Sequence, residues 1–456
     1  MQLKPWGVVL GDYYQQMCAE RKPFKVLEGF WTSVVLVQDL TAIKDIMITQ
    51  FENFPDRGFY VNHKDALSLN LVRLDYKLWK PLRQKLSPSF SPAKLRSMFP
   101  TLSKVGEQLV TVLRKECGVH GKSIEIYDLC SRFTIDFIGN VAFGMECNSL
   151  SEPNTEFRKQ GDRAFYNLLH PFVDMFGAKY PQILRLLNVK AFGKESNDFF
   201  KRVFKENLEY REKNNIRHQD FMDLLIDLKN EHHNNKELPM TSELLVGQTF
   251  AFFIGGFETS SSTMAYALYE MAKNGEIQQK AHEEVLRVLA GNNQTFTYEC
   301  LKDMRYLKTI IQETLRKYPV APAIPRVCRR TCTLKTSQHS SLTLQEGTTV
   351  IVAIYGIQHN SQLYPEPEKF APERFANDEE NAQRDPCSFL AFGAGPKICI
   401  GEQFGRLQMT LGLAIMLSEF KFSVCSNTPE ELHFDPKNMF VLAMKNGIVL
   451  NIEKYQ

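Results

Sequence analysis

Hydrophobic residues recur at a helical spacing of about 3.6 residues along most of the chain. Clear examples are the segments Leu102 to Cys117, Thr134 to Phe143 and Asp198 to Lys213. Patterns typical of strands are short and lie at residues 34–37, 348–354 and 440–452. In the last of these, Asn446 and Gly447 favour a hairpin turn, so we expect two paired strands there. The pattern predicts a mainly α-helical protein with small β-sheets.

The longest helical segment follows a polar loop at residues 229–237. Pro239 and the cap candidates Thr241 and Ser242 mark its start, and Gly275 marks its expected end. About 34 residues at a rise of 1.5 Å each extend roughly 50 Å, which is enough to cross the whole protein. We therefore expect this helix to pass through the core.

Composition narrows the class of protein. Of the 456 residues, 43% are hydrophobic and 23% are charged, as in a folded protein with a core large enough to bury a cofactor. We expect one domain over residues 1–456. The formal net charge of +3 is too close to balance to indicate a nucleic-acid partner. The apolar run from Phe250 to Phe257 is far shorter than the roughly 20 residues of a membrane-spanning helix, so no anchor is expected in this sequence.

The ten cysteines are scattered without a CxxC pair, which is typical of reduced thiols in a cytosolic setting. Cys328 and Cys332 are the closest pair, but no histidine stands at zinc-finger spacing from them. The absence of a CxxCH motif excludes covalent haem attachment of the c type.

Residues 392–401, FGAGPKICIG, place Cys399 in a glycine-rich loop before an apolar helix through Phe404 and Leu407. A helix amino terminus favours a thiolate, so we expect the pKa of Cys399 to be lowered. Gly395 permits a left-handed turn, and Gly401 lets the helix approach a flat ligand closely. Phe392 can shield the sulfur. The alternative is a buried structural cysteine in a tight turn.

This loop resembles the haem-binding signature of the cytochrome P-450 superfamily, in which the cysteine ligates the iron. The resemblance implies haem b (iron protoporphyrin IX) as cofactor, Cys399 as the metal ligand, and a haem buried between the long central helix and the helix after the cysteine loop. Phe392, Lys397 and Gly401 would contact the cofactor. The family usually has Arg where this chain has Lys397, and a lysine offers a point charge instead of a planar fork.

Three further motifs stand in the order that the family has. Glu313 and Arg316, in ETLR, share one face of a helix, although most such pairs are surface pairs worth only about 0.3 to 0.5 kcal/mol. They are followed by Arg374 in PERF. The resemblance implies a triad in which both arginines share the Glu313 carboxylate and lock the cysteine loop.

Trp79 and Arg83 lie four residues apart on an expected helix, so both can donate hydrogen bonds to one haem propionate. Pro81 between them must then lie in the first turn. The alternative is an amphipathic helix with one extended arginine at its surface. Arg326 is similar in placement to another propionate-binding arginine of the family.

The central helix carries Gly255, Gly256, Glu258 and Thr259. Two adjacent glycines cost about 1 kcal/mol each in a helix, so a reason for them is expected. Phe252, both glycines and Thr259 fall on one stripe, which the resemblance places over the iron. Thr259 can donate to the Gly255 carbonyl and open space for dioxygen and water, with Glu258 as the acid of a proton relay. The alternative is glycines that permit close helix packing.

Phenylalanine is abundant, at 33 of 456 residues. We expect aromatic side chains to line a pocket for lipophilic substrates. The candidates are Phe59, Tyr60, Phe252, Phe253 and Phe257.

The chain looks most similar to insect microsomal enzymes of the detoxification type, with FPDRGF at residues 54–59 among the matching segments. This resemblance implies an NADPH-dependent monooxygenase at the cytosolic face of the endoplasmic reticulum. Its electrons would come from a separate NADPH–cytochrome P-450 reductase docking near Lys397 or Arg406, with cytochrome b5 as a second partner. Relatives carry an amino-terminal anchor and a proline-rich hinge upstream of the part present here, so either this sequence is truncated or this form contacts the membrane peripherally. Residues 181–192 either dip into a bilayer surface or pack within the protein.

Two other functions stay open from the sequence. One is an isomerase or lyase that acts on a peroxide without a reductase, which the Glu258–Thr259 pair disfavours. The other is a haem-containing protein that binds hydrophobic compounds without turnover.

Overall fold

The structure is a computed structural model that describes residues 4–29, 33–118, 121–165, 170–230, 239–338 and 340–455. The polar loop expected at residues 229–237 lies outside the described residues from position 231 onward. The α-helices of the described chain are α1 Trp6–Ala19, α2 Leu40–Lys44, α3 Tyr76–Leu86, α4 Pro92–Cys117, α5 Ile126–Phe143, α6 Glu156–Phe165, α7 His170–Lys179, α8 Pro181–Leu186, α9 Lys194–Asn214, α10 Phe221–Asn230, α11 Ser242–Lys273, α12 Gly275–Ala290, α13 Cys300–Asp303, α14 Arg305–Lys317, α15 Ile354–Gln358, α16 Asp378–Gln383 and α17 Glu402–Glu419.

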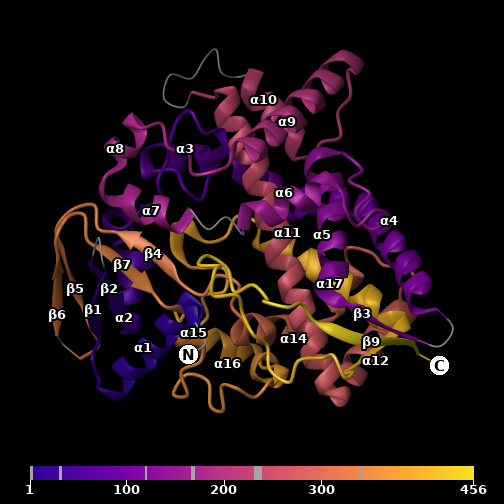
Figure 1. Cartoon of the computed structure of the whole chain (residues 1–456). Helices are drawn as coiled ribbons and strands as arrows, with labels where there is room; N and C mark the ends of the chain where they lie inside the picture. The colour runs from indigo at the N-terminus through magenta and orange to yellow at the C-terminus, as the bar shows by residue number, and fades with distance from the viewer. Residues whose placement is uncertain are drawn as a thin grey trace.

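The strands form small sheets beside the helical body (Figure 1). Their bounds are β1 Phe24–Glu28, β2 Ser33–Val37, β3 Lys122–Glu125, β4 Ile324–Val327, β5 Cys332–Lys335, β6 Ser341–Leu344, β7 Thr349–Val352, β8 Phe420–Ser423 and β9 Val449–Lys454. One sheet has the order β1-β2-β7-β4, in which β2 and β7 are parallel and the other neighbours antiparallel. The others are β3-β9-β8 and β5-β6. The mainly α-helical class with small sheets is confirmed.

Helix α11 runs through the middle of the molecule and packs against α5 and α17 (Figure 1). Thr241 caps it as predicted, since its hydroxyl accepts a hydrogen bond from the Leu244 N–H at 3.2 Å. The predicted end at Gly275 is wrong by two residues. Asn274 leaves the helical conformation, with φ −126° and ψ 76°, and Gly275 already begins α12.

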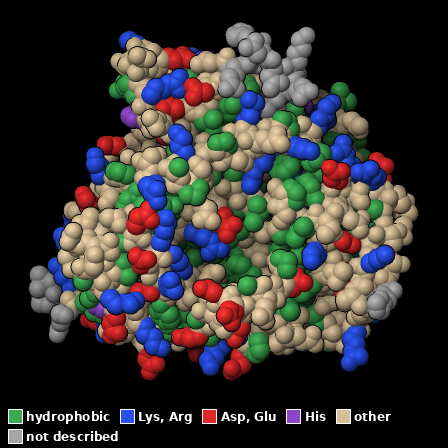
Figure 2. Space-filling model, turned by 180° about the vertical axis from the view of Figure 1, so that it is seen from behind, with side chains coloured by type: hydrophobic (Ala, Val, Ile, Leu, Met, Phe, Trp, Pro, Cys, Tyr) green, Lys and Arg blue, Asp and Glu red, His purple; other side chains and the backbone are tan. Residues whose placement is uncertain are grey.

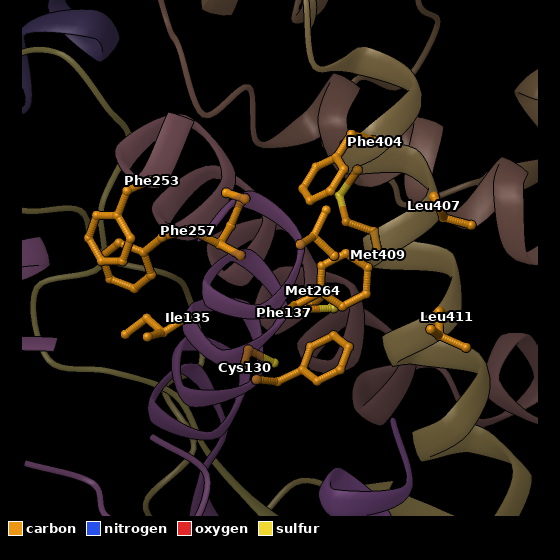
Figure 3. Close-up of a cluster of buried hydrophobic side chains, with 14 of the residues drawn as sticks. Cys130, Ile135, Phe137, Phe253, Phe257, Met264, Phe404, Leu407, Met409 and Leu411 are labelled. Atoms are coloured by element: carbon orange, nitrogen blue, oxygen red, sulfur yellow. The ribbon is translucent and has the colours of Figure 1, made fainter. Parts of the chain in front are cut away.

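The buried cluster where these three helices meet holds α11, α5 and α17 together (Figure 3). Phe257 and Met264 come from α11, Phe137 from α5, and Phe404 and Leu411 from α17. Phe137 and Phe404 meet edge to face, with their ring centroids 5.4 Å apart. Because interior residues pack at near-crystalline density, this cluster fixes the spacing of the helices that border the candidate site.

Two of the strand predictions need correction. The segment expected at 348–354 ends at Val352, because α15 begins at Ile354. The hairpin at Asn446–Gly447 contributes one strand, β9, instead of two. Gly447 does turn the chain, with φ +72°, but β9 pairs with β3 and β8. The Ile448 N–H bonds to the Glu125 carboxylate at 2.8 Å, so partners distant in sequence replace the local strand.

Candidate active site

The cysteine loop takes the tight conformation that its glycines predict. Gly395 has φ +68°, and a Cβ built there would stand 1.9 Å from the Met47 carbonyl oxygen, so no other residue fits. The Cys399 N–H donates to the Phe392 carbonyl at 2.8 Å, which folds the loop back on itself. Cys399 is exposed, although it leads directly into the largely buried helix α17. Its sulfur therefore borders open space.

The expectation that the helix amino terminus lowers the pKa of Cys399 is wrong for this protein. Burial raises the pKa of its thiol, and the opposing effects of the Gly401 N–H and of the Arg83 and Arg57 charges do not offset it. Although the residue is exposed, protein groups surround its thiol, and low polarity disfavours the anion. A metal bound to this sulfur would supply the deprotonation, because a coordinating thiol loses its proton outright.

Beneath the loop lies a set of buried ion pairs and hydrogen bonds that we call the loop network: Glu313, Arg316, Gln358 and Arg374. Arg316 donates from Nε and Nη2 to the two Glu313 oxygens at 2.8 and 2.9 Å, with both side chains fully buried. Arg374 Nε reaches the same carboxylate at 3.3 Å. The predicted sharing of Glu313 by both arginines is present.

Gln358, which the sequence did not indicate, joins this network to the cysteine loop. Arg316 Nη1 donates to the Gln358 carbonyl at 3.0 Å. The Gln358 side-chain oxygen accepts the Leu390 N–H at 3.0 Å, two residues before Phe392. A lone glutamine on a short helix carries no recognisable motif, so structural context alone identifies it.

Four basic side chains gather on the other side of the cysteine loop, and we call them the cation cluster: Arg57, Arg83, Arg326 and Lys397. Arg326 and Lys397 are buried, at 0% and 4% exposed. Arg57 and Arg83 are half-buried, and both feel the Cys399 charge. The sequence indicated the last three members. The sequence does not indicate Arg57 as a site residue, because nothing in its FPDRGF segment marks it as a partner for a carboxylate.

No carboxylate among the described residues forms an ion pair with the cation cluster, although the charge of Asp56 acts on both Arg326 and Lys397. Arg326 Nε and Lys397 Nζ are buried without a hydrogen-bond partner in the part of the chain that the structure describes. Lys397 Nζ lies 4.7 Å from the centroid of the Trp79 ring, a cation–π contact. Burial, then the charges of Arg57 and Arg326, lowers the pKa of Lys397 to about 7. Burial, then Arg57, lowers the pKa of Arg326 well below its ordinary value.

A buried cation is costly unless an anion neutralises it. A ligand with carboxylates would fit this cluster, and the two propionates of haem are such groups. Trp79 and Arg83 also border a surface cleft of about 400 Å³ with Pro396. The expectation that Pro81 lies in the first turn of α3 is wrong, because it lies in the second turn. Asp75 accepts the Leu78 N–H and so starts the helix at Tyr76.

The residues of α11 that were predicted to share one face over the cofactor have two different kinds of surroundings. Gly255 is exposed in the middle of this buried helix, with no atom within 4 Å of a Cβ built there. Thr259 donates to the Gly255 carbonyl at 2.6 Å, as predicted. Gly256, expected to contact the cofactor, faces α5 instead, because its Cβ would stand 2.3 Å from Ile138. Phe252 stacks on Phe221 at 4.3 Å and packs in the core.

Glu258 is buried and turned toward α5. Its carboxylate accepts hydrogen bonds from the Tyr127 hydroxyl at 2.6 Å and the Ser262 hydroxyl at 3.1 Å. Burial raises the pKa of Glu258 to about 7, against the lowering effect of both hydroxyls. Glu258 and Thr259 are therefore neighbours in sequence whose side chains have different partners.

Most of the expected pocket aromatics belong to the core. Phe253 and Phe257 are fully buried and stack on each other at 5.8 Å (Figure 3). Tyr60 is buried, with its hydroxyl bonded to the Val189 carbonyl at 3.0 Å. Phe59 is half-buried and meets Phe440 edge to face at 5.7 Å. The prediction of pocket lining is therefore wrong for most of these residues, because large apolar side chains gain most from full burial.

The docking role expected for Lys397 is also wrong, because its ammonium group is buried and cannot meet a partner protein. Arg406 pairs with Glu402 at 3.0 Å and lies over the Phe392 ring. On α3 the exposed basic side chains are those of Lys77 and Lys80.

Comparisons with known proteins agree with this geometry. The family model for Cytochrome P450 matches residues 9–451. The chain is 40% identical to Cytochrome P450 6a8 of Drosophila melanogaster over 452 residues, 98% of this chain and 88% of that protein. It is 40% identical to Probable cytochrome P450 6a18 of the same fly over 449 residues, 97% and 88% of the two chains. It is 38% identical to Cytochrome P450 6A1 of Musca domestica over 456 residues, 98% and 88% of the two chains.

These matches extend over nearly the whole chain and share one family description. The chain belongs to the cytochrome P450 family, resembles its insect members, and uses haem as its cofactor.

Proposed function

We propose that this chain is a haem-thiolate monooxygenase that inserts one oxygen atom from O2 into lipophilic substrates and reduces the other to water. The observation that carries the proposal is the pair of buried cations, Arg326 and Lys397, whose Nε and Nζ have no hydrogen-bond partner among the described residues, beside the exposed Cys399. Two carboxylates would neutralise the two cations, and one metal would bind the cysteine sulfur. Residues 1–456 act together as one catalytic domain.

The residues divide the binding of haem among themselves. Cys399 holds the metal, and Gly401 leaves room for a flat ring, since the nearest atom to a Cβ built there is 3.7 Å away. Gly255 leaves room on the opposite helix. The propionates are held by Trp79, Arg83, Arg326, Lys397 and Arg57. The Phe392 ring, at the start of the loop, lies against the Arg406 guanidinium at 4.8 Å and would shield the sulfur.

Bound through a thiolate, haem supplies the activation of dioxygen, because electron donation by sulfur favours cleavage of the O–O bond. Thr259 holds the Gly255 carbonyl with its hydroxyl and so keeps a backbone oxygen beside the open space. Glu258, with a pKa of about 7, stores a proton at its carboxylate near neutral pH. Tyr127 and Ser262 hold that carboxylate until it turns toward Thr259.

The electrons come from NADPH through a separate cytochrome P450 reductase, with cytochrome b5 as a second donor. Lys77 and Lys80 on the exposed face of α3 suit an acidic partner, in place of the buried Lys397. Figure 2 shows charges of both signs interspersed on the face opposite to that of Figure 1, with a hollow bordered by basic and hydrophobic side chains. This mixed surface suits a protein partner and not a nucleic acid.

A membrane surface is the proposed location, at the cytosolic face of the endoplasmic reticulum. No helix within the described ranges is long and apolar enough to cross a bilayer. Around α8, Leu186 and Leu187 are 87% and 67% exposed, and Phe172 on α7 is 69% exposed. Exposed apolar side chains beside the basic Arg185 favour contact with a lipid surface over packing within the protein.

The substrates are lipophilic xenobiotics, such as plant toxins or insecticides, or endogenous hormones. The support is the similarity to insect cytochromes P450 and the half-buried pair Phe59 and Phe440. Full-length protein with added reductase and a panel of such compounds tests the function. NADPH-dependent product supports the proposal. Turnover with peroxide alone, or binding without turnover, contradicts it.

A further inference from the structure

Cys328 and Cys332 form a thiol pair at the junction of two sheets. Their sulfur atoms lie 3.8 Å apart, and both thiols are free. Cys328 follows β4 and is fully buried, whereas Cys332 begins β5 and is half-buried. Within the described part of the chain, no group of three or more His, Cys, Asp or Glu residues is placed to hold a metal ion. The 3.8 Å separation places the two sulfurs close enough to react with each other after a small side-chain rotation.

The backbone holds both cysteines in place. The Cys328 N–H donates to the Thr348 carbonyl, and the Cys328 carbonyl accepts the Gly347 N–H, both at 2.8 Å. Cys332 pairs with Leu344 in the ladder between β5 and β6. A disulfide needs an S–S distance of about 2.0 Å, so rotation about the side-chain bonds must bring the sulfurs closer by roughly 1.8 Å.

We propose that Cys328 and Cys332 are a reversible oxidation site that forms an intramolecular disulfide by exchange with a small disulfide such as oxidised glutathione. The thiolate of the accessible Cys332 attacks the small disulfide, forms a mixed disulfide and releases one glutathione thiolate. The Cys328 thiolate then attacks the Cys332 sulfur and releases the second. Two protein thiols are oxidised, one glutathione disulfide is reduced, and the two thiol protons pass to the released thiolates.

Burial and the neighbouring charges set the pKa values of the two thiols, and these pKa values set the rate of exchange. Burial, then the neighbouring thiol, raises the pKa of Cys332 to about 12, against the lowering effect of Arg330. Burial also raises the pKa of Cys328. Because the thiolate is the reactive form, exchange is slow at neutral pH and accelerates as the pH rises. The site responds to sustained oxidising conditions.

The bond would join β4 to β5 covalently. Arg326 of the cation cluster lies on β4, two residues before Cys328. Between the cysteines, the Arg329 N–H donates to the Asn53 carbonyl at 2.7 Å, and the Arg329 guanidinium lies 5.6 Å from the Tyr76 ring centroid. The modification therefore closes a loop beside the proposed propionate site, although it does not depend on that proposal.

The test uses the haem-loaded full chain in buffers of increasing oxidised-to-reduced glutathione ratio, quenched with N-ethylmaleimide and digested with trypsin without reduction. Trypsin cuts after Arg326, Arg329 and Arg330, so the disulfide joins peptide 327–329 to peptide 331–335. We expect this linked pair to appear as the ratio rises and to vanish with reductant. Two alkylated peptides at every ratio, or a lasting glutathione adduct on Cys332, would overturn the proposal.

Two controls keep the result clear. Cys332→Ser removes the linked pair, whereas Cys18→Ser leaves it, because the half-buried Cys18 contacts Gln38 and Asn360 and, within the described residues, no second thiol. A second measurement needs no variant. Phenylarsine oxide, which binds two neighbouring thiols at once, protects both peptides of the reduced wild-type protein from N-ethylmaleimide. Protection of neither peptide would contradict the proximity of the two sulfurs.

Discussion

Arg316 and Arg326 are both fully buried arginines near the cysteine loop, yet their surroundings are opposite. Arg316 makes two hydrogen bonds to Glu313 and one to the Gln358 carbonyl. Arg326 bonds through Nη1 to its neighbour's carbonyl, its Nε has no partner among the described residues, and Arg57 adds a like charge nearby. A buried charge whose hydrogen-bond and ion-pair partners are all present therefore stabilises the fold, whereas one that lacks them indicates a ligand site.

This contrast follows from desolvation. A buried ion loses its hydration, and that cost is recovered through hydrogen bonds and opposite charge in the protein or in a ligand. The loop network recovers the cost within the chain itself. The cation cluster recovers it when a dianionic cofactor is present, so the two regions should respond differently to mutation.

The largest effect is expected from breaking the loop network. Glu313→Ala leaves Arg316 buried without its carboxylate and should lower the free energy of unfolding by about 3 to 5 kcal/mol, with or without haem. Urea unfolding followed by far-ultraviolet circular dichroism measures it. Glu373→Ala, which removes an exposed glutamate near the same network, is the control and should stay within about 0.5 kcal/mol of wild type. A stable Glu313→Ala protein would remove the distinction between the two regions.

The cation cluster should show the reverse behaviour. Arg326→Leu removes a buried charge that forms no ion pair among the described residues and lies close to the like charge of Arg57, so the haem-free protein should not lose stability. The loss of a charged hydrogen bond of about 1.5 to 3 kcal/mol should speed transfer of haem to apomyoglobin about 10- to 150-fold. Arg330→Leu, at a 66% exposed side chain, is the matched control. Equal haem retention in both variants would show that Arg326 does not hold a propionate.

Glu258 is a third kind of buried ionisable group, and its raised pKa can be tested through the pH dependence of stability. Its folded pKa of about 7 exceeds its ordinary value of 4.5, so the folded state binds the proton more tightly than the unfolded state. Stability should be full below pH 4.5 and should fall, by up to about 3 kcal/mol, as the pH rises through 7. Glu258→Gln should abolish this decline, and Glu243→Gln, at an exposed position, should keep it. Identical profiles for wild type and Glu258→Gln would refute the buried acid.

The smallest change in stability is expected on the open side of α11. Thr259→Ala removes one hydrogen bond and should cost about 1 kcal/mol. It should nevertheless lower the share of consumed NADPH that yields product, since the hydroxyl holds the Gly255 carbonyl beside the open space. Thr263→Ala removes the same kind of bond one turn later, at a buried position, and should keep coupling. Full coupling in the Thr259 variant would rule out its role.

The sequence predicted those features of the site that depend on spacing along one element. Thr259 to Gly255 and Arg316 to Glu313 are contacts within single helices, so their periodicity was enough. The left-handed Gly395 follows from the same local logic. The helical class was predictable because the hydrophobic period is strong in the long segments.

Features that depend on packing between distant segments were not predictable. Gly256 faces α5 because Ile138 fills the space beside it, and the hairpin near Gly447 loses a strand because Glu125 and β3 compete for its backbone. The pKa of Cys399 rises because burial outweighs the helix amino terminus, and burial is a tertiary property. Arg57 and Gln358 join the site from positions without a motif.

The most direct test of the account is the absorption spectrum of the purified, haem-loaded protein after reduction and exposure to carbon monoxide. Ligation by the Cys399 thiolate predicts a Soret band near 450 nm, the wavelength in the family's name, and its loss in Cys399→Ala. Folded, haem-loaded wild-type protein that lacks this band, or a Cys399→Ala variant that keeps it, would contradict the central claim.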